Sequence, residues 1–141
     1  MATFVLSEQF VEDLAKGVHN LDSDTFKAVL TNVEPDEASD FSLTDLTQIA
    51  NGNGYTTDGE TCGTPDAEQT SGTLKFTLGT DPVWTASGGS MAAFQWVVIY
   101  NDTSTGDKII GFCDYGSEVT LAVGETFTFN LDQSNGVLTI T

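Results

Sequence analysis

From Asp24 to the last residue, apolar and polar residues alternate with a period of two, the period of a β-strand with one buried face. β-Branched and aromatic residues fill these runs, and Gly, Asn, Asp and Ser separate them. Examples are TFKAVLT at residues 25–31, TLKFTLG at 73–79 and ETFTFNL at 125–131. In the first two, the alternation predicts strands with one face in solvent. Many short strands joined by turns predict an all-β, antiparallel β-sandwich or jelly-roll-like single domain.

The turns between these runs predict which strands are neighbours. AAFQWVVIY, residues 92–100, is apolar at nearly every position and predicts a central strand covered on both faces. A turn-rich connection of about six residues joins it to residues 107–114, which predicts a hairpin. The turn DQSNG similarly predicts a strand pair between 125–131 and 137–141. Residues 58–72, by contrast, read as a loop.

Only the beginning of the chain has a helical pattern, and it predicts a short helix over residues 7–16. Ser7 is expected to cap its N-terminus and Gly17 to end it. The apolar residues at helical spacing are Phe10, Val11, Leu14 and Val18. The sequence therefore divides into an N-terminal arm with a short helix, residues 1–19, and a β-sandwich domain, residues 20–141.

Charge excludes one large class of function. The chain has 21 acidic residues against four lysines and no arginine, which gives a formal net charge of −17. Nucleic-acid binding requires basic side chains that neutralise phosphates, so no nucleic-acid partner is expected. No stretch approaches the ~20 apolar residues of a membrane span and no signal segment is recognisable, so the sequence predicts a soluble protein made in the cytoplasm without a membrane partner. A solvated acidic surface and complementarity to a basic partner both remain open.

No motif predicts a metal or cofactor site. Cys62 and Cys113 lie far apart in the sequence without a CxxC motif, so zinc is not expected. Two reduced thiols are the default in a reducing compartment, and a disulfide after release from the cell remains open. The stretch NGNGYTTDGETC resembles a calcium loop only at its start, because Tyr55 and Cys62 occupy positions where such a loop has oxygen ligands.

Catalysis is not expected either. His19 is the only histidine, and no serine or cysteine lies in a recognisable nucleophile motif, so His19 is predicted to be a surface or helix-end residue. A pair of carboxylates such as glycosidases use would not indicate an active site here, because 21 acidic residues offer many such pairs. The aromatic side chains could form a surface that binds sugar rings, or they could pack in the core. Trp96 lies in the apolar run and is expected to be buried, whereas Trp84 lies beside turns and is expected to be exposed.

The order of several short motifs gives the chain a resemblance. They are DTFKAVLTN, GNGYTTDGE, VWTA, FQWVVIYNDTSTGDKIIGFCDYG and GVLTIT. Over residues 20–141, this order resembles a family of small tailed-bacteriophage virion proteins. Asp58 departs from the family pattern, which has the first of two paired glycines there. The most specific elements are Gly54 with Tyr55, Trp84, Tyr100 with Asp102, and the stretch Asp114 to Gly116.

The resemblance implies a virion structural protein without enzymatic activity, specifically a capsid decoration or cement protein that binds and stabilises the outer shell. It implies a location on the capsid exterior after assembly in the host cytoplasm. Its implied partners are the major capsid protein and neighbouring copies of itself, as a homo-oligomer on the capsid. A tail or fibre protein that binds host-surface glycans is the alternative, and a small β-sandwich enzyme is a third hypothesis.

Copies with a charge of −17 repel one another, so association is expected to depend on apolar contact. The N-terminal segment, residues 2–16, is the predicted source, because its apolar residues lie outside the strand pattern. Salt would strengthen association through such an interface or leave it unchanged, because salt screens the repulsion between the acidic copies. The predicted partner-binding residues are Phe4, Val5, Leu6, Phe10, Val11, Leu14 and Trp84.

Overall fold

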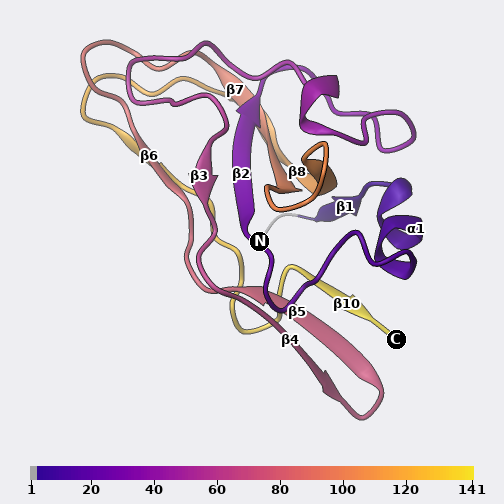
Figure 1. Ribbon diagram of the computed structural model, residues 1–141. Helices are drawn as coiled ribbons and strands as arrows, with labels where there is room; N and C mark the ends of the chain where they lie inside the picture. Colours follow the sequence, from indigo (N-terminus) through magenta and orange to yellow (C-terminus); the bar gives the residue numbers. More distant parts are fainter. Residues whose placement is uncertain (1–2) are drawn as a thin grey trace.

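The computed structural model describes residues 3–141, and most of its regular structure consists of short antiparallel strands (Figure 1). This confirms the predicted all-β single domain with one short α-helix near the N-terminus. The elements are β1 (Phe4–Leu6), α1 (Gln9–Ala15), β2 (Phe26–Thr31), the 3-10 helix η1 (Leu43–Asp45), β3 (Glu60–Thr61), β4 (Pro65–Thr70), β5 (Thr73–Leu78), β6 (Val83–Thr85), β7 (Phe94–Asn101), β8 (Lys108–Val119), β9 (Thr126–Thr128) and β10 (Leu138–Ile140).

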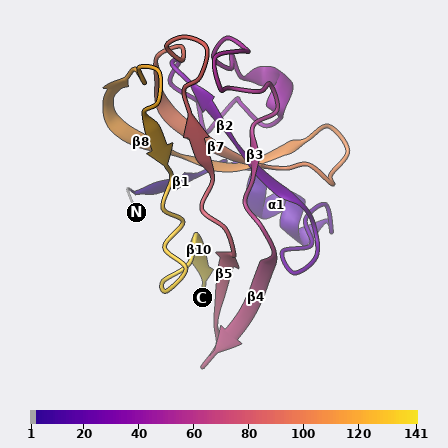
Figure 2. The ribbon, with the colours of Figure 1, turned by 90° about the vertical axis from the view of Figure 1, so that its left-hand side faces the viewer.

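The strands form three sheets. A five-stranded sheet has the order β1-β8-β7-β2-β3, a three-stranded sheet the order β10-β5-β4, and β6 pairs with β9. The predicted hairpin and central strand are confirmed, because β7 lies between β8 and β2 and pairs Val97 with Cys113. The β4–β5 hairpin projects from the rest of the molecule (Figures 1 and 2). Residues 65–70, expected to be loop, form its first strand.

The main core lies on the inner face of the five-stranded sheet, toward the other two sheets. It joins β2, β5 and β6 through buried side chains such as Phe26, Phe76 and Trp84. The rings of Phe26 and Phe76 meet edge to face, with centroids 5.0 Å apart. All three sheets therefore contribute to one core.

A second cluster of buried residues covers the outer face of the five-stranded sheet. It contains Val29, Val98 and Tyr100 from the central strands and Leu43 from η1. The expectation of a solvent-exposed face on β2 is therefore wrong, because Val29 packs beneath the segment that contains η1. Alternation shows which side chains share a face, but it does not show what covers that face.

The predicted pairing of the last two strands is also wrong. β9 pairs with β6, with Phe127 opposite Trp84, whereas β10 pairs with β5. Between them, Phe129 and Leu131 are buried in the core. Because these side chains fill the space between the sheets, the chain crosses from one sheet to another instead of folding back on itself.

Part of the N-terminal segment is a strand of the five-stranded sheet, which corrects the expectation that Phe4, Val5 and Leu6 lie outside the strand pattern. β1 forms the edge of the five-stranded sheet, with Leu6 opposite Gly111 on β8. Ser7 does not cap α1, because it lies one residue before the cap position and its backbone N–H donates to Ile110 O at 3.0 Å. Gly17 follows the last helical turn with φ +76°, as predicted for a helix end.

Candidate functional site

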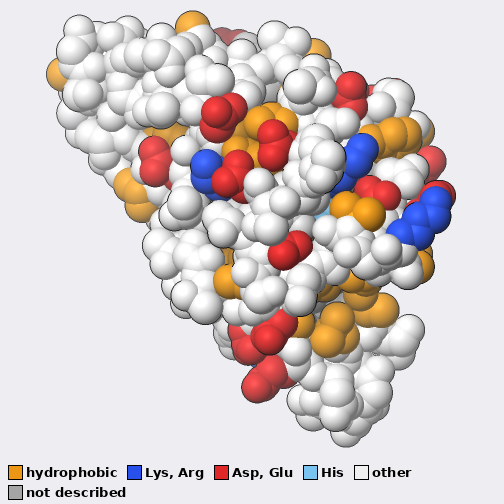
Figure 3. Space-filling view, in the orientation of Figure 1, with side chains coloured by type: hydrophobic (Ala, Val, Ile, Leu, Met, Phe, Trp, Pro, Cys, Tyr) orange, Lys and Arg blue, Asp and Glu red, His pale blue; other side chains and the backbone are white. Residues whose placement is uncertain are grey.

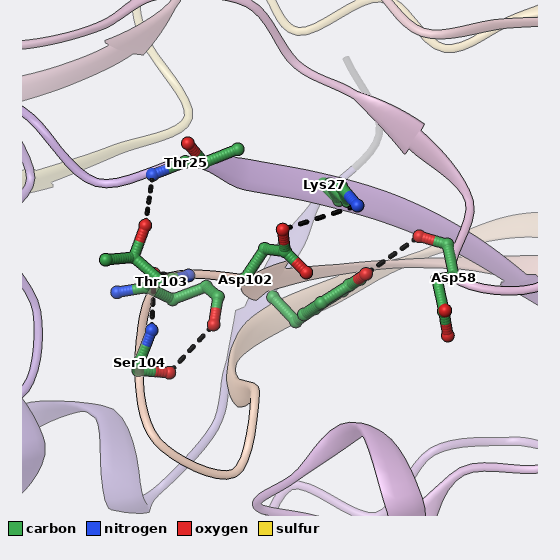
Figure 4. A network of polar contacts seen from close by, with 8 residues as sticks. Thr25, Lys27, Asp58, Asp102, Thr103 and Ser104 are labelled. Atoms are coloured by element: carbon green, nitrogen blue, oxygen red, sulfur yellow. Dashed lines mark hydrogen bonds and ion pairs between the residues drawn. The ribbon is translucent and has the colours of Figure 1, made fainter.

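The residues of the most specific sequence motifs are the first candidates for a functional site. Figure 4 shows the contacts around Asp102, whose carboxylate forms a 3.3 Å ion pair with Lys27 Nζ. The Tyr100 hydroxyl donates to the backbone carbonyl of Asp58 at 2.8 Å, and Thr25 N–H donates to Thr103 Oγ1 at 2.8 Å. These contacts tie β2, the end of β7 and the turn before β3 to one another.

The glycine-tyrosine motif has the same kind of role. Tyr55 is buried, and its hydroxyl donates to Gln48 Oε1 at 2.6 Å and accepts from Leu30 N–H at 3.3 Å. A Cβ at Gly54 would lie 2.0 Å from the carbonyl oxygen of Thr85, so only glycine fits between the two segments. Asp58 has φ +77°, a conformation that aspartate tolerates, so the turn forms without the family's first glycine.

The third motif fixes a turn-like part of β8. Asp114 Oδ1 accepts from Gly116 N–H at 2.7 Å and from Gln95 Nε2 at 2.9 Å. Tyr55, Tyr100, Asp102 and Asp114 of the three motifs thus bond within the chain, and these contacts help to maintain the fold.

His19 is buried, which corrects the expectation of a surface or helix-end residue. Its ring stacks on Phe10 with centroids 5.5 Å apart, and its Nδ1 lies 3.0 Å from Asn101 Nδ2. Asn101 Oδ1 accepts from Thr103 and Ser104 N–H groups, so its Nδ2 is the donor toward His19. His19 Nδ1 is therefore an acceptor, and the neutral ring carries its proton on Nε2.

We expect His19 to make the protein less stable as the solution becomes acidic. Burial lowers the pKa of His19, against the opposing effects of Asp13 and Asp24 and with a smaller lowering by Lys108. A folded-state pKa below the unfolded value of about 6.5 means that the unfolded chain binds more protons below that pH. The free energy of unfolding should fall as pH decreases from about 7 through the folded-state pKa. Urea denaturation across this range should show the fall in the original protein, and His19→Gln should flatten it.

Of the seven predicted partner-binding residues, two are buried, four are half-buried and one is exposed. Phe10 is 1% exposed, and Val11, at 66%, is the one large apolar residue of α1 that faces solvent. Trp84 is 1% exposed, so the prediction that it lies at the surface is wrong. It belongs to a three-residue strand whose partner, β9, places Phe127 against it. The remaining residues, which are half-buried against the two cores, are Phe4, Val5, Leu6 and Leu14.

A surface groove, which the sequence did not predict, lies where the five-stranded sheet meets β9. We call it the β8–β9 groove; its volume is about 270 Å³. Its floor is apolar and largely buried, and the exposed rim includes Tyr115, at 56% exposure, whose ring meets Phe127 edge to face at 5.6 Å. The lining residues are Val97, Cys113, Asp114, Tyr115, Phe127, Thr128, Phe129 and Asn130.

The groove combines an apolar floor with exposed polar residues at its rim. An apolar floor with a polar rim is the usual arrangement of a protein-binding patch. The thiol of Cys113 is at the floor, and burial raises its pKa to about 11, so the reactive thiolate is scarce at neutral pH. Burial likewise raises the pKa of the Cys62 thiol to about 12. Both cysteines are buried thiols in the structure.

Comparisons with protein-family models, curated proteins and solved structures found no match. Within residues 3–141, no three His, Cys, Asp or Glu side chains are grouped so that they could hold a metal ion. Over the same residues, none of the helices has the length and apolar character needed to cross a membrane.

Proposed function

We propose that this protein is a structural component of a bacteriophage virion, specifically a capsid decoration protein that binds the outer shell and stabilises it. Its partners are then the major capsid protein and neighbouring copies of itself on the capsid exterior. The observation that carries the proposal is that the motif side chains Tyr55, Asp102 and Asp114 bond within the chain, while the groove beside Tyr115 offers apolar surface to a partner.

The character of the fold supports this role. A decoration protein requires a rigid body and a surface for contact, and here one core is shared by three antiparallel sheets. The surface is strongly acidic, and on the face in Figure 3 acidic side chains are distributed with few lysines among them. Such a surface repels packaged nucleic acid and attracts basic protein segments.

A tail or fibre protein that binds host glycans is the second candidate. The observation in its favour is the exposed ring of Tyr115 next to Asn130 on the rim of the same groove. Aromatic faces and amide groups are common in sugar-binding sites. The small volume of the groove limits such a ligand to about one sugar ring.

Location in the particle separates these candidates. A cryo-electron microscopy reconstruction of virions that contain this chain should show its fold, with the projecting β4–β5 hairpin, in many copies on the outside of the capsid. Density only on the tail would favour the glycan-binding candidate. Absence of the chain from purified virions would contradict both.

A further inference from the structure

We propose that the free edge of β4, in the projecting β4–β5 hairpin, binds an extended segment of a partner protein as an added antiparallel strand. This segment carries lysine or arginine at alternate positions. The inference rests on the proposed function, since it specifies the chemistry of the partner. It concerns the three-stranded sheet, whose strands contribute no residue to the β8–β9 groove.

The first observation is a regular strand edge without a neighbour. The three-stranded sheet has the order β10-β5-β4, and β4, with six residues, is the longest edge strand within residues 3–141. Its pairing with β5 runs from Pro65 opposite Leu78 to Thr70 opposite Thr73 without a bulge. The hairpin projects from the rest of the molecule (Figures 1 and 2). Such an edge readily accepts a further strand.

The second observation is the direction of the backbone groups of β4. The turn residues 71–72 both have positive φ, the geometry of a two-residue hairpin turn whose flanking residues bond to each other. Bonded and non-bonded pairs alternate along an antiparallel ladder, and the bond of 2.9 Å from Gly79 N–H to Thr64 O fits this alternation. The N–H and C=O groups of Ala67 and Gln69 therefore point away from β5. These groups have no partner within residues 3–141.

The third observation is the charge beside this edge. Ala67 packs against the main core, so its side chain lies on the inner face of the hairpin. Asp66 and Glu68 alternate with it and therefore lie on the outer face, where both are exposed. Neither carboxylate has a partner within residues 3–141, because Lys75, opposite Glu68, donates instead to Ser134 O at 3.2 Å. Acidic side chains are visible along the hairpin in Figure 3.

Charge decides between the possible occupants of the edge. If the β4 strands of two copies paired with Ala67 opposite Ala67, each Asp66 would be opposite a Glu68 of the other copy, and four carboxylates would meet on one face. The net charge of −17 on each copy opposes this contact further. A strand with lysine or arginine opposite Asp66 and Glu68 instead brings opposite charges together, with Cβ atoms about 5 Å apart. The favoured occupant is therefore a basic segment of a different protein.

The geometry also states which backbone groups of the added strand bind. The residues opposite Ala67 and Gln69 exchange hydrogen bonds with them, and the basic residues alternate with these residues. The N–H groups of the basic residues therefore point away from β4. Salt should weaken this contact, which is the opposite of the effect expected for apolar docking through residues 2–16.

The test uses the purified protein and a fluorescent peptide of about eight residues in which valine and lysine alternate. Two further peptides of the same sequence carry N-methyl groups on the valines or on the lysines. All three have the same charge, so a general attraction to the acidic surface affects them equally. We expect the unmethylated and lysine-methylated peptides to bind alike, and the valine-methylated peptide to bind at least about tenfold more weakly, because it has lost the donors that face β4.

Amide hydrogen exchange, measured residue by residue, locates the bound peptide. Binding should slow exchange at Ala67 and Gln69, whose N–H groups are free in the unbound protein. The N–H of Glu68 already points to β5 and serves as the internal control.

A double variant tests the charges of β4. Asp66→Asn with Glu68→Gln should weaken the unmethylated peptide about fivefold and reduce the salt dependence of its binding. The control variant Glu34→Gln with Glu37→Gln removes the same charge at exposed positions before η1, on the other side of the five-stranded sheet, and should bind like the original protein. Thermal unfolding checks that both variants are folded.

Equal binding of the two methylated peptides would mean that charge alone attracts them, and it would overturn the proposal. So would unchanged exchange at Ala67 and Gln69 in the presence of bound peptide, or no binding of any of the three peptides. These results concern the edge of β4 alone. The position of the protein on the virion is measured independently, so failure of one proposal is distinguishable from failure of the other.

Discussion

Removal of residues 1–16 should unfold the protein. The deletion takes away β1 and α1, and with them the core side chain of Phe10 and the half-buried side chains of Phe4, Leu6 and Leu14. Together, such side chains contribute on the order of 5 kcal/mol or more of burial free energy. A domain of this size is stable by only about 5 to 15 kcal/mol. Circular dichroism on heating should therefore show a weakened or absent cooperative transition.

Two substitutions make the deletion interpretable. Phe10→Ala should lower the free energy of unfolding by about 3 to 5 kcal/mol, because a buried ring leaves a cavity. Val11→Ala, on the exposed side of the same helix, should change it by less than about 0.5 kcal/mol. A truncated protein that unfolds cooperatively at the original temperature would show that the segment is a separate arm. In that case its apolar residues would be available to a partner, and the hypothesis of docking through residues 2–16 would again hold.

The elements with strong local patterns could be predicted from the sequence. β7 was recognisable because it is apolar on both faces, and its hairpin with β8 followed from the short connection between them. β1 was missed because Phe4–Leu6 is too short to show a period and precedes a helical pattern. The pairing of β9 with β6 was missed because alternation identifies a face and does not identify the neighbouring strand.

The candidate site was harder to predict from the sequence than the strands were. The β8–β9 groove joins Tyr115 and Phe127, which belong to different sheets and approach each other only after the chain has crossed between them. The sequence showed Tyr115 as an aromatic residue in the stretch Asp114 to Gly116, but its exposure depends on β1 pairing with β8 only from Gly111 to Cys113. The burial of His19 similarly depends on Asn101, far along the chain. Contacts of this kind have no local signature.

Trp84→Ala should lower the free energy of unfolding by about 3 to 5 kcal/mol. The Trp84 ring is buried and stacks on Phe127 with centroids 6.0 Å apart, so its removal leaves a cavity between β6 and β9. The loss should also loosen Phe127, which contacts Tyr115 at the groove. Urea denaturation followed by circular dichroism measures the change.

Trp84→Phe separates packing from hydrogen bonding. Trp84 Nε1 has no hydrogen-bond partner among residues 3–141, so phenylalanine removes a buried N–H that costs free energy while it keeps an aromatic ring. We therefore expect a loss of less than about 1.5 kcal/mol. The variant also leaves Trp96 as the sole tryptophan, and its fluorescence then reports on the outer face of the sheet. If Trp84→Ala instead kept full stability and lost only partner binding, the ring would act at the surface, and its position in the core would be wrong.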